Sequence, residues 1–313
     1  MTTDTSVFTG LEKSSRLKEK LFGNIASGSG IFILVILTAV AVFLVGLSLP
    51  ALLTTEELPL GTGEFWSYVL PFAFGTLWAA TLAMFFAVPV AIGIALFISH
   101  YAPRKLAQSL GYIIDLLAAV PSVVYGLWGI NILAPAIQPL YMWLNINVGW
   151  FPLFGGEYSA TGRTILTASL VLAVMVLPII TAICREVFLQ TPKLHEEASL
   201  ALGATRWEMI RQAVLPFAIP GIISGVMLGL GRALGETMAV AMVLSPAAII
   251  SFQVLTYENP NTIASNIALA FPEAYELGVN QLIATGLVLF IITLIVNVAA
   301  RLIIARRQAF LES

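Results

Sequence analysis

Charged side chains are scarce in this sequence: Asp, Glu, Lys and Arg make up 10% of its 313 residues, against about 25% in soluble domains. Hydrophobic residues make up 59%, and the mean hydropathy is +0.95. This composition predicts an integral membrane protein in contact with membrane lipid. The formal net charge of -2 indicates no basic surface of the kind that binds nucleic acid, so we expect no nucleic-acid partner.

Cysteine and histidine are nearly absent as well. The single cysteine, Cys184, excludes an internal disulfide and a metal site built from several cysteines. The long apolar runs contain no histidine, so they offer no nucleophile paired with a base. The sequence also lacks the Gly-x4-Gly-Lys-Ser/Thr phosphate loop of many ATPases. We therefore expect a non-enzymatic chain without a metal or another cofactor.

Six long apolar runs dominate the sequence. They cover residues 31–53, 72–99, 112–133, 164–187, 217–244 and 282–304. A hydrocarbon core of about 30 Å is crossed by a helix of about 20 apolar residues, and the alternating pattern of a membrane barrel is absent. We expect an all-α protein with six transmembrane helices. Residues 31–53 form the first, a core at 70–305 holds the other five, and 1–30 and 306–313 are cytoplasmic ends.

The basic residues predict the orientation of these helices. With six spans, thirteen of the fifteen fall on one side: Lys13, Arg16, Lys18, Lys20, Arg104, Lys105, Arg185, Lys193, Arg206, Arg211, Arg301, Arg306 and Arg307. Arg163 falls on the other side, and Arg232 lies within a span. Because cytoplasmic loops carry the excess of Lys and Arg, we predict that both termini and segment 190–215 are cytoplasmic. The aromatic-rich loop 134–163 and the loop 245–281 then face outward.

Segment 190–215 is predicted to lie in water, because its charged side chains would be costly in a bilayer. These side chains are Glu196, Glu197, Arg206, Glu208 and Arg211. Apolar residues at helical spacing on either side of Gly203 predict two short helices that meet there. On spacing alone, an ordinary cytoplasmic loop is an open alternative.

Three pieces of this segment resemble a known family: Glu197-Ala198-Ser199, Gly203-Ala204 and Leu215-Pro216. The EAA loop in the permease subunits of ABC importers reads Glu-Ala-Ala, three residues, Gly, nine residues, Ile, one residue and Leu-Pro. This chain departs from it at Ser199 and Ala213. The resemblance implies the type I permease fold of ABC importers. It also implies that the segment is a coupling helix, seated in a cleft of a separate ATP-hydrolysing subunit.

A narrower resemblance lies in residues 119–129 (AVPSVVYGLWG) and 231–240 (GRALGETMAV). These stretches look like the permease of the high-affinity phosphate importer, and more like its PstC-type than its PstA-type subunit. The similarity covers roughly residues 70–305. It implies a bacterial inner-membrane protein that transports inorganic phosphate. Its implied partners are a PstA-type permease, a PstB-type ATP-binding dimer and an extracytoplasmic phosphate-binding protein of the PstS type.

Run 217–244 contains two ionisable residues, Arg232 and Glu236. If the run is one helix, Arg232 lies about 22 Å from its start, near the bilayer midplane, and Glu236 follows one turn later on the same face. Small residues on this helix would let a neighbour approach closely: Gly221, Gly225 and Gly229. Two interpretations are open. The two charges form a static salt bridge, or Arg232 is shared between Glu236 and a phosphate in transit along the substrate path.

The residues alone do not identify the substrate. One buried arginine suits any small oxyanion, so sulfate and molybdate are alternatives to phosphate. A secondary transporter driven by an ion gradient is another class, but it predicts more spans or inverted repeats and gives no reason for segment 190–215. We expect Asp115 to lie near the cytoplasmic start of the third helix in an interfacial role. His100 and His195 are expected to be solvated in cytoplasmic loops.

Overall fold

The computed structural model describes residues 5–54, 58–61 and 63–311, so residues 1–4 and 312–313 of the predicted cytoplasmic ends lie outside the described residues. In chain order the elements are α1 (Thr5–Leu53), α2 (Phe65–Leu96), η1 (Phe97–Tyr101), α3 (Arg104–Ala118), α4 (Ser122–Trp128), η2 (Gly129–Leu133), α5 (Ala134–Val148), α6 (Ile165–Leu189), α7 (Lys193–Ala201), α8 (Arg206–Met209), η3 (Ile210–Val214), α9 (Leu215–Leu234), α10 (Met238–Val243), β1 (Pro246–Ala247), β2 (Asn259–Pro260), α11 (Ile263–Ala270), η4 (Phe271–Glu273) and α12 (Leu277–Leu311). The two short strands pair in parallel.

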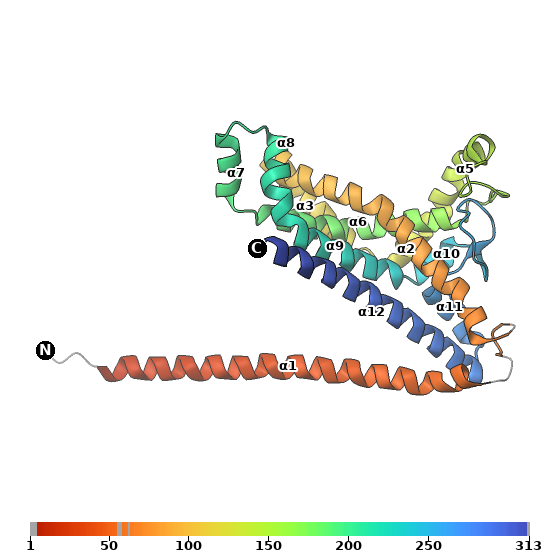
Figure 1. Ribbon diagram of the computed structural model, residues 1–313, viewed down its shortest axis with the longest axis horizontal. Coiled ribbons are helices and arrows are strands. Elements are labelled where there is room, and N and C mark those ends of the chain that lie inside the picture. The colour runs from red at the N-terminus through yellow and green to blue at the C-terminus, as the bar shows by residue number, and fades with distance from the viewer. Residues whose placement is uncertain (1–4, 55–57, 62, 312–313) are drawn as a thin grey trace.

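The described residues contain six helical stretches that are long and apolar enough to cross a membrane, which confirms the predicted number. They are Leu21–Leu53, Phe65–Tyr101, Ser122–Val148, Ile165–Leu189, Arg206–Leu234 and Leu277–Leu302. In Figure 1 the start of α1, the end of α12 and the α7–α8 pair lie at one end of the molecule, and α5 and α11 lie at the other. The segments predicted to be cytoplasmic therefore share one end.

The third apolar run, 112–133, is not one helix, so this part of the prediction is wrong. Helix α3 ends at Ala118, and α4 begins at Ser122 with Pro121 as its N-cap. Proline lacks a backbone N–H and disfavours helical geometry in the residue before it, which explains the break. The span that follows, Ser122–Val148, extends beyond the predicted end. It places the first part of the expected aromatic loop in a helix.

The core of the bundle is built where small residues let helices approach closely. On α2, alanines at a spacing of four residues are buried against α6: Ala79, Ala83, Ala87, Ala91 and Ala95. On α9, glycines take the place of these alanines against α6. A Cβ at Gly225 would lie 3.0 Å from Ile183, and one at Gly229 would lie 2.8 Å from Ile180. This confirms that the glycines of the fifth run face a neighbouring helix, which is α6.

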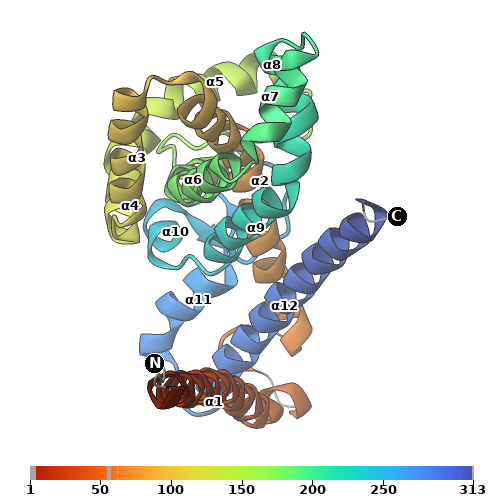
Figure 2. The same ribbon diagram turned by 90° about the vertical axis from the view of Figure 1, so that its left-hand side faces the viewer.

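Helix α1 lies at the edge of the molecule. Figures 1 and 2 both show it apart from the bundle of α2, α6 and α9, with α12 between them. No residue in the most apolar part of its span is buried in the isolated chain. A small cluster that includes Ala51, Phe65 and Ala284 connects its end to α2 and α12. In a membrane, the rest of α1 faces lipid or another subunit.

Candidate functional site

The fifth apolar run is broken where its two charges lie. Helix α9 ends at Leu234, Gly235 follows as its C-cap, and α10 begins at Met238. Arg232 therefore lies in the last turn of one helix and Glu236 precedes the next. The prediction that both residues share one face of a continuous helix, four residues apart, is wrong. Among the described residues the two side chains form no ion pair within 4.0 Å.

Glu236 closes the start of α10. Its Oε1 accepts a hydrogen bond from the backbone N–H of Ala239 at 3.0 Å, and the residue is 9% exposed. The first backbone N–H groups of a helix have no partner within the helix, and a carboxylate there also interacts favourably with the helix dipole. The backbone N–H of Gly235 still bonds to the Gly231 oxygen at 3.3 Å, so α9 ends after this bond and the Glu236 side chain serves the next helix. The sequence did not reveal this role.

Arg163 closes the other end of the same short helix. Its Nη2 donates to the backbone oxygens of Leu244 at 3.0 Å and Met242 at 3.4 Å. Asn259 supports this arrangement by donating from Nδ2 to the Arg163 backbone oxygen at 3.1 Å. A cation at the end of a helix satisfies its last carbonyls and is favoured by the dipole. The signal in the sequence was that Arg163 is the outlying basic residue in the charge pattern.

Arg232 differs from Glu236 and Arg163, whose side chains both bond to backbone groups. Arg232 is half-buried, and within the described part of the chain it makes no hydrogen bond or ion pair. It lies in the neighbourhood of Tyr125 of α4, whose hydroxyl already donates to the Leu117 backbone oxygen at 2.9 Å. A guanidinium keeps its proton and has five N–H donors. Arg232 therefore presents unused N–H donors at the break between α9 and α10, where an anion can accept their hydrogen bonds.

The two stretches 119–129 and 231–240 are packed against one another. A Cβ at Gly126 of α4 would lie 3.0 Å from Ala239 Cα and 3.1 Å from the Met242 sulfur on α10. At Gly129 it would lie 2.8 Å from Val243 and 2.6 Å from Val171 on α6. Glycine at these two positions is what lets the short helix lie against α4. The two motifs thus form one structural unit beside Arg232.

Two helices meet around Gly203 as predicted, but only the first is short, because the second begins with α8 and continues through η3 into α9. Helix α7 ends at Ala201, and Gly203 has φ +88, a left-handed conformation that glycine adopts easily. A capping box then starts α8: Glu208 Oε2 accepts from the Thr205 backbone N–H at 2.8 Å, and Glu208 N–H donates to Thr205 Oγ1 at 3.3 Å. The carboxylate accepts hydrogen bonds from the backbone N–H of Thr205 and, at 2.7 Å, from its hydroxyl, and these two bonds lower the pKa of Glu208. The chain is therefore built to turn sharply here.

Most of the other residues predicted for this segment lie on its outer surface. Glu197 and Ala198 are exposed on α7, whereas Ala204 is half-buried and donates its backbone N–H to the Ser199 oxygen at 3.3 Å. Large apolar side chains are exposed too, with Leu194 at 78% and Leu202 at 89%. In the isolated chain, α7 buries none of its residues. This surface has the composition of a protein interface.

Two expectations for this region need correction. The predicted segment 190–215 does not end as a separate unit, because the helix that begins at Arg206 continues through Leu215-Pro216 into α9. The π-helical turn η3 lies just before it, and such a turn gives the backbone a local irregularity next to the proline. His100 is not solvated: its side chain is 9% exposed, and Nε2 lies 3.6 Å from Glu196 Oε1 on α7. This contact joins α7 to the end of the α2 span.

Comparison with known proteins agrees with this architecture. Residues 87–309 match the family described as binding-protein-dependent transport system inner membrane component. The chain belongs to this family. It is therefore a multi-pass inner-membrane transport component, consistent with its six spans.

Individual relatives are similar over nearly the whole chain. The phosphate transport system permease protein PstC 2 of Mycobacterium tuberculosis is 45% identical over 302 residues, which is 93% of each chain. PstC of Mesorhizobium japonicum is 38% identical over 305 residues, covering 94% of this chain and 92% of the relative. Among solved structures, a bacterial alginate ABC transporter matches with a TM-score of 0.58 at 18% identity, over 96% of this chain and 98% of the other. That likeness confirms the fold of the ABC importer permeases.

Proposed function

We propose that this chain is the transmembrane permease subunit of an ATP-driven phosphate importer. The observation that carries the proposal is the 45% identity to a PstC phosphate permease over 93% of both chains. The geometry supports it, because Arg232 presents a guanidinium with no ion-pair partner among the described residues at the helix break that ends α9. In the proposed layout, residues 1–30 and 306–313 are cytoplasmic and 70–305 form the permease core.

In this proposal Arg232 contacts the phosphate as it passes. Five N–H donors on a planar group can hold two phosphate oxygens at once. A single cation gives a site strong enough to admit the anion but shallow enough to release it. Glu236 does not contact the phosphate in this proposal; it holds the start of α10 in place beside Arg232 through its hydrogen bond with Ala239. The remaining wall of the path comes from a second permease subunit of the PstA type.

The energy for transport comes from a partner in this proposal. Helix α7 and the Gly203 turn, with their exposed leucines, dock into a cleft of a PstB-type ATP-binding dimer. The contact of His100 with Glu196 offers a direct connection from α7 to the end of the α2 span. Phosphate is delivered on the outer side by a PstS-type binding protein. The chain itself is non-catalytic.

The decisive experiment is transport by the reconstituted system. The chain, its PstA-type and PstB-type partners and the binding protein are incorporated in liposomes, and uptake of 32P-labelled phosphate is followed with ATP inside. We expect phosphate uptake that requires both ATP and the binding protein. Excess unlabelled sulfate or molybdate should not inhibit it. Uptake of labelled sulfate or molybdate in place of phosphate would contradict the substrate assignment while leaving the permease role intact. Uptake driven by an ion gradient without ATP would contradict both.

A further inference from the structure

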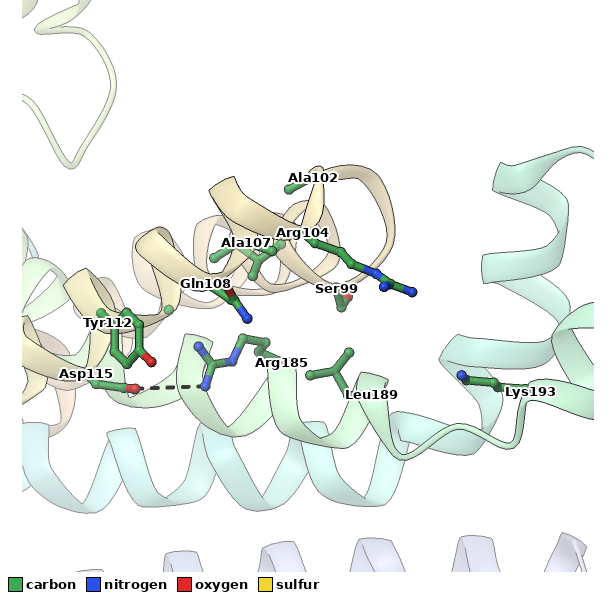
Figure 3. A pocket seen from close by; sticks show the side chains of 12 residues that line it. Ser99, Ala102, Arg104, Ala107, Gln108, Tyr112, Asp115, Arg185, Leu189 and Lys193 are labelled. Carbon is green, nitrogen blue, oxygen red and sulfur yellow. Dashed lines mark ion pairs between the residues drawn. The ribbon is translucent and has the colours of Figure 1, made fainter.

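A cleft of about 610 Å³ lies at the end of the molecule that carries α7, and Arg232 is not among the residues that line it. The walls come from η1 with the turn after it, from α3, from the last turns of α6 and from the start of α7. Three cations line the cleft, Arg104, Arg185 and Lys193, together with the carboxylate of Asp115 (Figure 3). The cleft therefore carries a net positive charge in a concave surface.

Arg185 is the best-buried of these cations, and its hydrogen-bonding capacity is largely unused. Its Nη2 lies 4.0 Å from Asp115 Oδ2, a long distance for an ion pair. Its Nε is buried and has no hydrogen-bond partner among the described residues. Gly111 makes the room that this side chain occupies, since a Cβ there would collide with Arg185 Nη1. An unsatisfied buried donor is costly unless a ligand or water accepts its hydrogen bond.

The other two cations are also uncompensated. Arg104 and Lys193 are exposed, and no described carboxylate lies within 4.0 Å of either. The amide of Gln108 adds a neutral polar group on the α3 wall (Figure 3). Like charges gathered in a concave surface concentrate their field and raise the local concentration of anions. The arrangement is that of an anion-binding site in which the Asp115 carboxylate competes with the anion for Arg185.

We infer that this cleft binds a phosphate group. The planar fork of Arg185 matches two phosphate oxygens, and the flanking cations complete the neutralisation. Exposed apolar side chains continue from the cleft along α3, with Tyr112 at 76% and Leu116 at 70%. The same chemistry is offered by the phosphodiester of an anionic lipid, whose chains would cover this apolar surface, and by free inorganic phosphate from the cytoplasm.

Two substitutions on α3 change the charge of the cleft in opposite directions. Gln108→Glu adds a carboxylate of nearly the same size and should weaken binding roughly ten-fold. Asp115→Asn removes the carboxylate that competes for Arg185 and should strengthen binding several-fold. Both side chains are exposed, so neither change should prevent folding. Arg211→Gln removes an exposed cation outside the cleft and serves as the matched control.

The test uses the detergent-solubilised full-length chain. Native mass spectrometry measures the binding of phosphatidylglycerol, with phosphatidylcholine as the zwitterionic comparison, and equilibrium dialysis measures 32P-labelled phosphate in an Arg232→Gln background. The site is supported if the binding of either anion falls in Gln108→Glu, rises in Asp115→Asn and is unchanged in Arg211→Gln. The anion that behaves in this way shows whether the phosphate group comes from a lipid or from free phosphate. If neither ligand binds, or if binding is equal in all variants, the inference is wrong.

Discussion

The Glu236 carboxylate lies 3.0 Å from the Ala239 backbone nitrogen, and this hydrogen bond satisfies a backbone N–H in the first turn of α10. The two charges of the fifth run therefore serve different helix ends, and Arg232 is left free for an anion. Exchanging the two residues would put a carboxylate at the end of α9 and a guanidinium at the start of α10, where both helix dipoles oppose them. Such an exchange would disturb the fold itself, so single substitutions separate the roles better.

Replacing Arg232 should strongly reduce transport and leave the fold intact. Because this side chain has no partner among the described residues, Arg232→Gln should change the free energy of unfolding by less than about 0.5 kcal/mol. Phosphate uptake should fall roughly ten- to hundred-fold, which is the effect of losing a charged hydrogen bond to the substrate. Arg232→Lys keeps the positive charge but loses the planar guanidinium, so its phosphate uptake should lie between that of the unchanged protein and that of Arg232→Gln. A large loss of thermal stability with unchanged uptake per folded molecule would instead indicate a structural role.

Removing the Glu236 hydrogen bond should weaken both fold and transport. Glu236→Ala loses the bond to Ala239 and should lower the free energy of unfolding by about 1 kcal/mol. Glu236→Gln keeps an acceptor oxygen and should recover part of that stability. The measurement is the thermal unfolding midpoint of the solubilised protein, read alongside uptake. Equal midpoints for the alanine and glutamine variants would argue against this role of the hydrogen bond.

A side chain at Gly126 should push α10 away from α4. In Gly126→Val the new Cβ would lie 3.0 Å from Ala239 Cα and 3.1 Å from the Met242 sulfur, so overpacking should cost about 1–3 kcal/mol. Gly231→Ala is the matched control in the same region, because a Cβ there meets nothing within 4 Å. The control should retain uptake and gain slightly in stability, since alanine favours helix. Comparable behaviour of the two variants would show that the packing of α10 is unimportant.

The turn at Gly203 should depend on backbone conformation and not on space. Nothing lies within 4 Å of a Cβ at this position, but φ is +88, which a β-branched residue adopts at high cost. Gly203→Val should therefore reduce uptake and copurification of the ATPase subunit, whereas Gly203→Asn should retain most of both. Membrane abundance of each variant is the control. Normal coupling in the valine variant would mean that this segment is an ordinary loop.

The predicted orientation can be checked with reporter fusions at residues 10 and 310. Both should report the cytoplasmic side, as should a fusion within segment 190–215, because all three share one end of the molecule (Figure 1). A fusion in the 245–281 loop should report the outside. Opposite signals from the two ends of the chain would mean that the number of spans is odd.

The sequence by itself determined the class of protein, the number of spans and the helix–turn–helix around Gly203. These follow from local composition: a run of about 20 apolar residues has few alternatives in a bilayer, and a glycine between two amphipathic stretches favours a turn. The family motifs were readable too, since residues 119–129 and 231–240 are contiguous in the chain.

The tertiary structure alone decided what each charged side chain contacts. Glu236 bonds a backbone group three residues on, and Arg163 reaches carbonyls about eighty residues away, so neither partner follows from a helical repeat. The burial of His100 against α7 likewise depends on how distant segments pack. Apolar content dictates that a segment enters the membrane, but the partner of a polar group inside the bundle is fixed only when all the helices are in place.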